Sequence, residues 1–208
     1  MDNFTARLII CVDGNDKSYV LFNGTEVYYT KLRTAYSDIL KNKKTKYLYF
    51  SFFTLCAATL EYSLNFILTN YCLNNFGHER YKSYAEGYIN MSFPKKLLMT
   101  PSIISNGNLI FNENTLTFKT LSELITLRNR ILHNKEFLKE IDFPSLTENA
   151  HKETIEFELI NEPNYIDTLN KDLCVKFGTA LGDFKRRLMD PALANELTDN
   201  TILIKCRT

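Results

Sequence analysis

The chain has 208 residues, of which 45% are hydrophobic and 24% are charged, and its formal net charge is +1. These values are typical of a globular protein with one sizeable domain, or with one domain and a small appendage. Because the net charge is close to zero, the chain lacks the overall positive field that attracts nucleic acid. Any contact with RNA or DNA therefore has to use a local basic cluster.

Motif content excludes several common classes of protein. The chain contains no P-loop, no Gly-x-Gly-x-x-Gly and no Gly-x-Ser-x-Gly motif, which removes the commonest nucleotide-binding and hydrolase interpretations. The five cysteines are scattered and form no Cys-x-x-Cys pair, which argues against a disulfide framework and a zinc knuckle. The opening MDNFTARLII lacks the charged start and long apolar core of a signal peptide. We therefore expect a cytoplasmic protein.

Both ends of the chain are predicted to contain β-structure. Residues 1–35 are expected to form a β-rich extension, because RLIICVDG and KSYVLFNG flank the turn-rich DGND as in a hairpin. The segment NGTEVYYT predicts a third strand. Residues 191–208 are expected to form a tail in which TILIKCRT is a strand. Pairing of this strand with the hairpin would join the two termini in a small sheet.

Helical spacing dominates residues 36–190, the predicted main domain. A first helix is expected in TKLRTAYSDILKNKK and a long second helix over residues 46–75. The second segment is apolar enough to be compared with a membrane span, but Glu61 and Asn65 interrupt it. A charge near the middle of a spanning helix is energetically costly. We therefore predict a buried core helix and no membrane contact.

The remainder of the main domain is predicted to be helical on either side of a long connection. HERYKSYAEGYINM predicts a short helix, and the Asn- and Gly-rich PSIISNGNLIFNENTLTF predicts the connection. FKTLSELITLRNRILHNKEFLKEI predicts the next helix, with Thr120 and Glu123 at the spacing of a capping box. ETIEFELI is a short strand or linker, and NYIDTLNKDLCVKFGTALGDFKRRLM predicts a final amphipathic helix. The predicted fold class is thus mainly α.

Arg128, Asn129 and His133 lie in the middle of the segment that holds the predicted capping box. The bare Arg-x4-His spacing is only weakly specific. Asn129 and His133 are four residues apart and share a face of a helix. Arg128 lies about 140° around the helix from His133, so only a long side chain can bring its guanidinium near the imidazole. A solvated helix face and half of a catalytic centre both fit this pattern.

The run LSELITLRNRILHN resembles the third-helix signature of HEPN (higher eukaryotes and prokaryotes nucleotide-binding) domains. These all-helical modules are marked by Arg, a polar residue and then His in an R-x(4 to 6)-H pattern. The earlier FFTLCAATLEYSLNFI is similar to a core helix of this family. The order of PKKLLMTPSII, a long connection and LSELITLRN is that of prokaryotic members. Over residues 40–190 the resemblance implies a HEPN-like helical bundle.

The resemblance implies metal-independent endoribonuclease activity at a homodimer interface, without a cofactor. His133 would act as general base or acid on the ribose 2′-OH and the leaving 5′-oxygen, which suits a group that exchanges protons near neutral pH. Arg128 would stabilise charge on the phosphate through two parallel hydrogen bonds. Asn129 would orient His133 or the scissile phosphate. The products would carry 2′,3′-cyclic phosphate and 5′-hydroxyl ends.

Three further residues complete the predicted site. Arg130 and Lys135 make the neighbourhood basic and are expected to contact RNA, although a solvated helix face would carry them as well. Some HEPN toxins carry a modifiable tyrosine where this chain has Lys135, so that modification is not expected here. Glu61, inside an apolar helix, is expected to have a buried partner, and an arginine of the motif is the candidate.

The resemblance implies RNA, a second copy of the chain and an antitoxin or other regulatory protein as partners. The biological setting would be a toxin or an anti-phage defence effector. The three histidines are far apart in the sequence, so no metal site is expected. The alternative interpretation is a non-catalytic HEPN-like module that binds RNA or a protein with the same face. A weaker alternative is a helical subunit in which the motif is coincidental.

Overall fold

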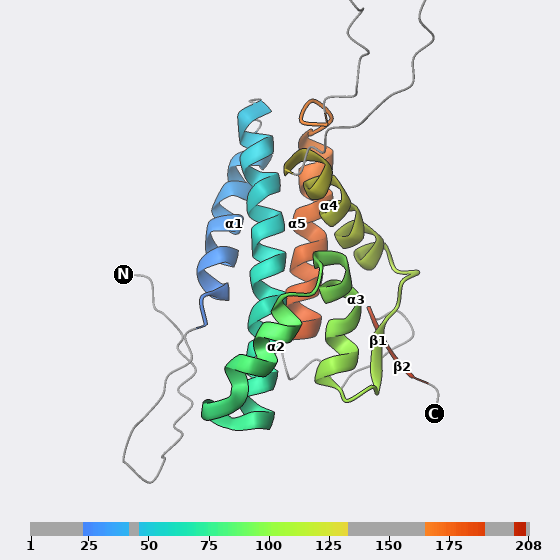
Figure 1. Cartoon of the computed structure of the whole chain (residues 1–208). Helices are drawn as coiled ribbons and strands as arrows, with labels where there is room; N and C mark the ends of the chain where they lie inside the picture. The colour runs from blue at the N-terminus through green and yellow to red at the C-terminus, as the bar shows by residue number, and fades with distance from the viewer. Residues whose placement is uncertain (1–22, 42–45, 133–164, 190–201, 207–208) are drawn as a thin grey trace, which may run out of the picture.

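A computed structural model describes residues 23–41, 46–132, 165–189 and 202–206 of the chain. Helices account for most of these residues, so the predicted mainly α fold class is confirmed (Figure 1). In chain order the elements are α1 (Thr25–Leu40), α2 (Lys46–Ile89), α3 (Phe93–Ile104), β1 (Leu109–Phe111), α4 (Leu116–Leu132), α5 (Lys171–Phe184), the π-helix η1 (Lys185–Met189) and β2 (Leu203–Lys205).

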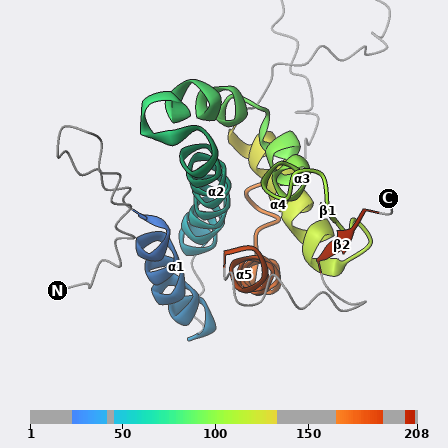
Figure 2. The ribbon, with the colours of Figure 1, turned by 90° about the horizontal axis from the view of Figure 1, so that it is seen from below.

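The helices α1, α2 (in its first part) and α5 run side by side, and α3 and α4 pack against them to complete the core (Figures 1 and 2). Phe53 of α2 meets Phe177 of α5 with ring centroids 6.0 Å apart. Burying one large apolar side chain stabilises a fold by about 1.5–3 kcal/mol, so the apolar stripes hold these helices together. The largest fully buried side chains are Phe52, Phe53, Phe177, Phe184, Ile39, Leu60, Leu64, Leu68, Leu97, Leu121, Leu124 and Ile125.

Helix α2 consists of two parts that meet at Gly77. This glycine has φ 72° and ψ 170°, a backbone conformation that a residue with a side chain rarely adopts. By length and composition alone α2 is sufficient to cross a membrane, and half of its most apolar window is buried inside the protein. Phe53 and Leu60 of this window are fully buried. The prediction of a core helix in this segment is confirmed.

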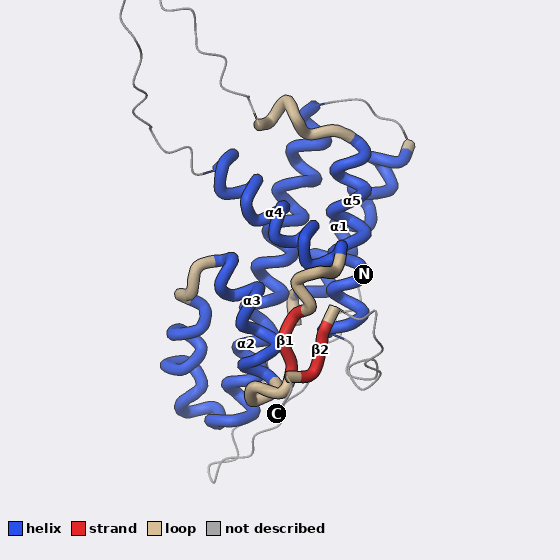
Figure 3. Tube along the Cα trace, turned by 90° about the vertical axis from the view of Figure 1, so that its right-hand side faces the viewer, coloured by secondary structure: helices blue, strands red, loops and turns tan. Residues whose placement is uncertain are grey.

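The small sheet differs from the predicted one. The C-terminal strand exists as β2, but it pairs with β1 in antiparallel register, with Ile110 opposite Ile204 (Figure 3). Strand β1 lies inside the segment that was expected to be a long connection, so that expectation was wrong. Phe111 and Leu203 are buried, and this burial fixes the short strands against the helices. The hairpin predicted in residues 1–22 lies outside the described residues.

The third strand predicted in NGTEVYYT is wrong, because α1 begins at Thr25. Asn23 accepts a hydrogen bond from the backbone N–H of Thr25 at 3.0 Å, next to the first turn of the helix. Thr25, Tyr29 and Leu32 then fall on one buried face at helical spacing. The strand preference of Val and Tyr gives way to this packing, since β-propensity depends strongly on context. Residues 25–35 therefore belong to helix α1 and not to a β-rich extension.

The capping box predicted at Thr120 and Glu123 is also wrong. Helix α4 begins at Leu116, so both residues lie inside the helix. The Thr120 side chain is buried. Glu123 is exposed and forms an ion pair with Lys176 of α5. The N-terminus of α4 instead uses Thr115, whose hydroxyl oxygen accepts a hydrogen bond from the backbone N–H of Phe118 at 3.3 Å.

Candidate functional site

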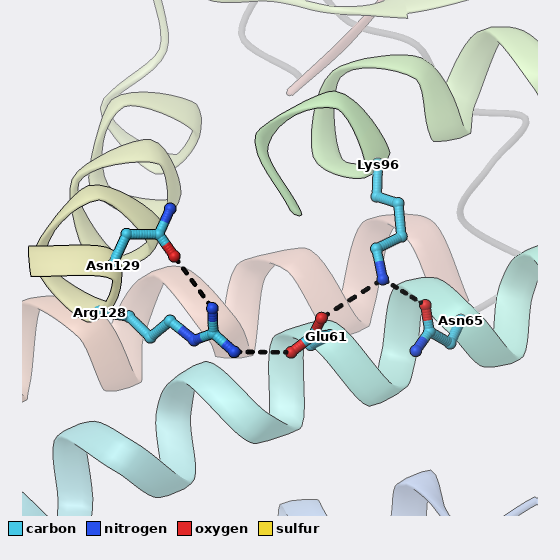
Figure 4. Close-up of polar contacts among 5 residues, drawn as sticks. All are labelled: Glu61, Asn65, Lys96, Arg128 and Asn129. Atoms are coloured by element: carbon cyan, nitrogen blue, oxygen red, sulfur yellow. Dashed lines mark hydrogen bonds and ion pairs between the residues drawn. The ribbon is translucent and has the colours of Figure 1, made fainter. Parts of the chain in front are cut away.

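Helix α4 places the predicted motif at the edge of the core. Leu121, Leu124 and Ile125 are buried and form the inner face of the helix. With this face turned inward, the next turn carries Arg128 and Asn129 to the margin where α4 meets α2 and α3 (Figure 4). Both side chains are partly buried. Arg128 and Asn129 are therefore neither in the core nor on an open helix face.

The Arg128 guanidinium is held by neighbours on three helices, α2, α3 and α4 itself. Its Nη1 donates a hydrogen bond to Oδ1 of Asn129 at 3.0 Å. Its Nη2 lies 3.6 Å from Oε2 of Glu61 on α2. The guanidinium carbon lies 5.8 Å from the centre of the Phe93 ring, within the range of a cation–π contact. The predicted pairing of Glu61 with an arginine of the motif is thus confirmed as a contact.

Lys96 of α3 is the buried partner of Glu61 that the sequence interpretation missed. Its side chain is only 4% exposed, and its Nζ lies 3.3 Å from Oε1 of Glu61. The same ammonium donates a hydrogen bond to Oδ1 of Asn65 at 2.9 Å (Figure 4). A buried ammonium requires such partners because it has lost its hydration. The spacing of the sequence could have indicated this burial, because Lys96 lies between Phe93 and Thr100 on the buried face of α3.

The Glu61 carboxylate is shared by two cations. Glu61 contacts Lys96 through one oxygen and Arg128 through the other. Lys96 is closed off from solvent, whereas the side chain of Arg128 is 22% exposed. A ligand can therefore reach Arg128 but not Lys96. A guanidinium matches the oxygens of a phosphate in geometry.

The structure describes only one of the remaining predicted site residues, Arg130. Arg130 is exposed, and its guanidinium carbon lies 5.2 Å from the centre of the Tyr165 ring. His133 and Lys135 lie outside the described residues, which on α4 end at Leu132. The structure thus brings together Glu61, Arg128 and Asn129 of the predicted set.

Comparison of the chain with models of protein families, with curated proteins and with solved structures finds no significant match. Within the described part of the chain, no group of three or more His, Cys, Asp and Glu side chains is placed to hold a metal ion.

Proposed function

We propose that the protein is a metal-independent endoribonuclease of the HEPN type. It cleaves RNA to 2′,3′-cyclic phosphate and 5′-hydroxyl ends at an interface between two copies of the chain, as a cytoplasmic toxin or anti-phage defence effector. The observation that carries this proposal is the placement of Arg128. The arginine of the motif is oriented by Asn129 and Glu61, and it remains accessible to a ligand.

The contacts of Arg128 give the proposed site its electrostatic part. A fixed guanidinium stabilises charge that develops on a phosphate without having to reorganise during the reaction. The hydrogen bond to Asn129 and the ion pair with Glu61 limit the rotamers of the side chain, so less entropy is lost when a phosphate binds. The Glu61 carboxylate contacts both Lys96 and Arg128, and the side chain of Arg128 remains 22% exposed, so its guanidinium can contact a phosphate.

The proton-transfer part is assigned to His133, the residue that follows Leu132 in the sequence. An imidazole can accept the proton of the 2′-OH and donate one to the leaving 5′-oxygen. This kind of catalysis contributes about 10²- to 10⁴-fold in rate. RNA lacking the attacking 2′-OH, and DNA, are expected to resist cleavage. Arg130 is exposed on α4 and is assigned to the RNA backbone, together with Lys135.

A second candidate function is a non-catalytic module that binds RNA or a protein with the same face. It is favoured by the fact that Arg128 already has protein partners, namely Asn129 on the same helix and Glu61, which holds α4 to α2. A binding module tolerates loss of His133, whereas a nuclease does not. The two functions therefore predict opposite results for the His133→Ala variant.

The test is incubation of purified protein with total cellular RNA in the presence of EDTA. We expect cleavage by the wild type and by the Glu123→Gln variant, which alters an exposed ion pair on the same helix. We expect loss of at least about 10² in rate for His133→Ala. The new 3′ ends should be cyclic phosphates and the new 5′ ends hydroxyls. Equal cleavage by wild type and His133→Ala, or dependence on a divalent metal, would reject the proposal.

The proposed interface between two copies has its own test. The cleavage rate per chain should fall when the protein is diluted below the dissociation constant of the dimer, and mass measured by light scattering should fall over the same range. A fully active monomer at all concentrations would contradict a site shared between two copies.

A further inference from the structure

A second candidate site lies between α1 and α5, away from the cluster around Arg128. A pocket of about 420 Å³ opens between these two helices. Helices α1 and α4 lie on different sides of α5, so the pocket and the motif helix are separated by α5 (Figures 1 and 2). The volume falls within the range of small-molecule sites, about 300–1,000 Å³.

The wall of the pocket is mainly apolar. Tyr29, Leu32 and Tyr36 of α1 line one side, and Gly178 and Gly182 of α5 line the other. Packing explains the glycine at position 178, because a Cβ there would lie 2.9 Å from Cε2 of Tyr36. Packing does not explain the glycine at position 182, since a Cβ built there meets no atom within 4 Å. Glycine destabilises the interior of a helix relative to alanine. At position 182 the absence of a side chain leaves space in the pocket.

Three cations surround this apolar space, namely Arg33, Lys185 and Arg186. Lys185 pairs with Glu26 at 2.7 Å, and Arg186 pairs with Asp183. Arg33 is exposed and makes no hydrogen bond or ion pair among the described residues. One positive charge at the pocket is therefore left without a carboxylate partner.

The helix geometry changes at the pocket. Helix α5 ends at Phe184 and continues as the π-helix η1, which carries Lys185 and Arg186. π-Helical turns are rare in proteins and are found frequently at functional sites. An apolar pocket, a glycine without a packing reason, an unpartnered arginine and a π-helix thus coincide at one place.

We propose that the pocket between α1 and α5 binds a small organic anion. Its flat apolar body occupies the space between the tyrosine rings and Gly182, and its carboxylate or phosphate group contacts Arg33. Apolar contact with Leu32 and the Tyr36 ring supplies binding energy, and the charge-assisted hydrogen bond to the guanidinium supplies selectivity. This site is independent of the proposed nuclease function.

The test uses two fluorescent probes with the same ring system. 8-Anilinonaphthalene-1-sulfonate carries one negative charge, and N-phenyl-1-naphthylamine is neutral. We expect the anionic probe to bind the wild type at one saturable site and the neutral probe to bind about tenfold more weakly, the effect of one charge-assisted hydrogen bond. Arg33→Gln should weaken binding of the anionic probe by a similar factor and leave the affinity for the neutral probe unchanged. Gly182→Leu should abolish binding of both.

Matched controls are available elsewhere in the fold. Gly87 of α2 is another helical glycine whose Cβ would meet no atom within 4 Å, and Arg80 is another exposed arginine. Gly87→Leu and Arg80→Gln should bind both probes as the wild type does. Circular dichroism identifies variants that fail to fold, and if Gly182→Leu is one of them the surface variant Arg33→Gln decides alone. Absence of saturable binding to the wild type, or wild-type affinity of folded Arg33→Gln for the anionic probe, overturns the proposal.

Discussion

Oε2 of Glu61 on α2 lies 3.6 Å from Nη2 of Arg128 on α4, although the two residues are far apart in the sequence. The other oxygen of the same carboxylate contacts Lys96 on α3. Glu61 therefore joins three helices through one charged group. The same contact that stabilises the fold also sets the position of the arginine that we propose to bind phosphate.

Replacement of Glu61 by glutamine should destabilise the protein. The variant removes the carboxylate that contacts both Arg128 and Lys96, while Asn65 still accepts a hydrogen bond from Lys96. We expect the free energy of unfolding to fall by about 1–3 kcal/mol, the range for a polar group that loses its partner. Urea unfolding measures this change. The control Glu123→Gln, which breaks an exposed pair, should lose at most about 1 kcal/mol. Equal losses in the two variants would contradict a special role of Glu61.

Replacement of Lys96 by methionine should be less harmful than replacement of Glu61. Methionine fills a similar space, the desolvation penalty of the ammonium disappears, and Glu61 keeps Arg128 as a partner. Buried ion pairs can be replaced by apolar groups with little loss, whereas removal of one partner alone leaves an uncompensated charge. We expect the unfolding free energy of Lys96→Met to exceed that of Glu61→Gln by about 1 kcal/mol or more. The opposite order would show that Lys96 contributes more than its position suggests.

Two glycines of α5 should respond differently to alanine. Gly178→Ala brings a Cβ to within 2.9 Å of the Tyr36 ring, and Tyr36 is itself packed near Phe52. Gly182→Ala places its Cβ in open space. We expect Gly182→Ala to gain about 0.5–1 kcal/mol from helix propensity, and Gly178→Ala to lose about 1 kcal/mol through overpacking. Thermal unfolding of the two variants compares them directly. An increase in stability in both variants would mean that the Tyr36 ring moves aside without cost.

Alkaline pH should destabilise the protein through its buried thiols. Burial raises the pKa of Cys174 from 9.0 to about 12. Burial is also the main cause that raises the pKa of Cys56, and the nearby Cys174 raises it further. Above pH 9 the unfolded chain loses these protons and the folded chain keeps them, so stability is full below pH 9 and declines as the pH rises. Each such thiol lowers the unfolding free energy by up to about 1.4 kcal/mol per pH unit.

Urea unfolding at pH 8, 9 and 10 measures this decline. The Cys56→Ala/Cys174→Ala variant should show a shallower dependence on pH than the wild type, although its stability at pH 8 is lower because of lost packing. Burial also raises the pKa of Tyr29 well above 10.0, so a further decline above pH 10 should remain in this variant. Identical pH dependence of variant and wild type would exclude the thiols as its cause.

The sequence predicted local features better than long-range ones. The apolar stripe of α4 was predictable because Leu121, Leu124 and Ile125 repeat at helical spacing. Glu61 was recognised as needing a partner because it interrupts an apolar helix. Lys96 was missed, since lysine is rarely buried and its partners Glu61 and Asn65 are brought to it only by the packing of α2 on α3.

The strands show the same limit. TILIKCRT was predicted as a strand from its composition, but its partner β1 has only three residues in a segment rich in turn formers. A strand of this length leaves no periodic pattern, and pairing over such a distance in the chain depends on the assembled helices. The strand predicted in residues 23–30 was wrong for the opposite reason. Its β-branched and aromatic residues favour a strand locally, and packing of Tyr29 and Leu32 overrides that preference.

The central claim is that Arg128 binds the scissile phosphate in addition to holding α4 to α2. The most direct measurement is the rate of RNA cleavage by Arg128→Lys in EDTA, with the free energy of unfolding determined on the same preparation. Lysine keeps the charge opposite Glu61 but cannot form two parallel hydrogen bonds to a phosphate. We predict a rate at least about 100-fold below wild type, with a stability loss of about 1 kcal/mol or less. Cleavage within a few-fold of the wild-type rate would contradict the claim and leave Arg128 a structural residue.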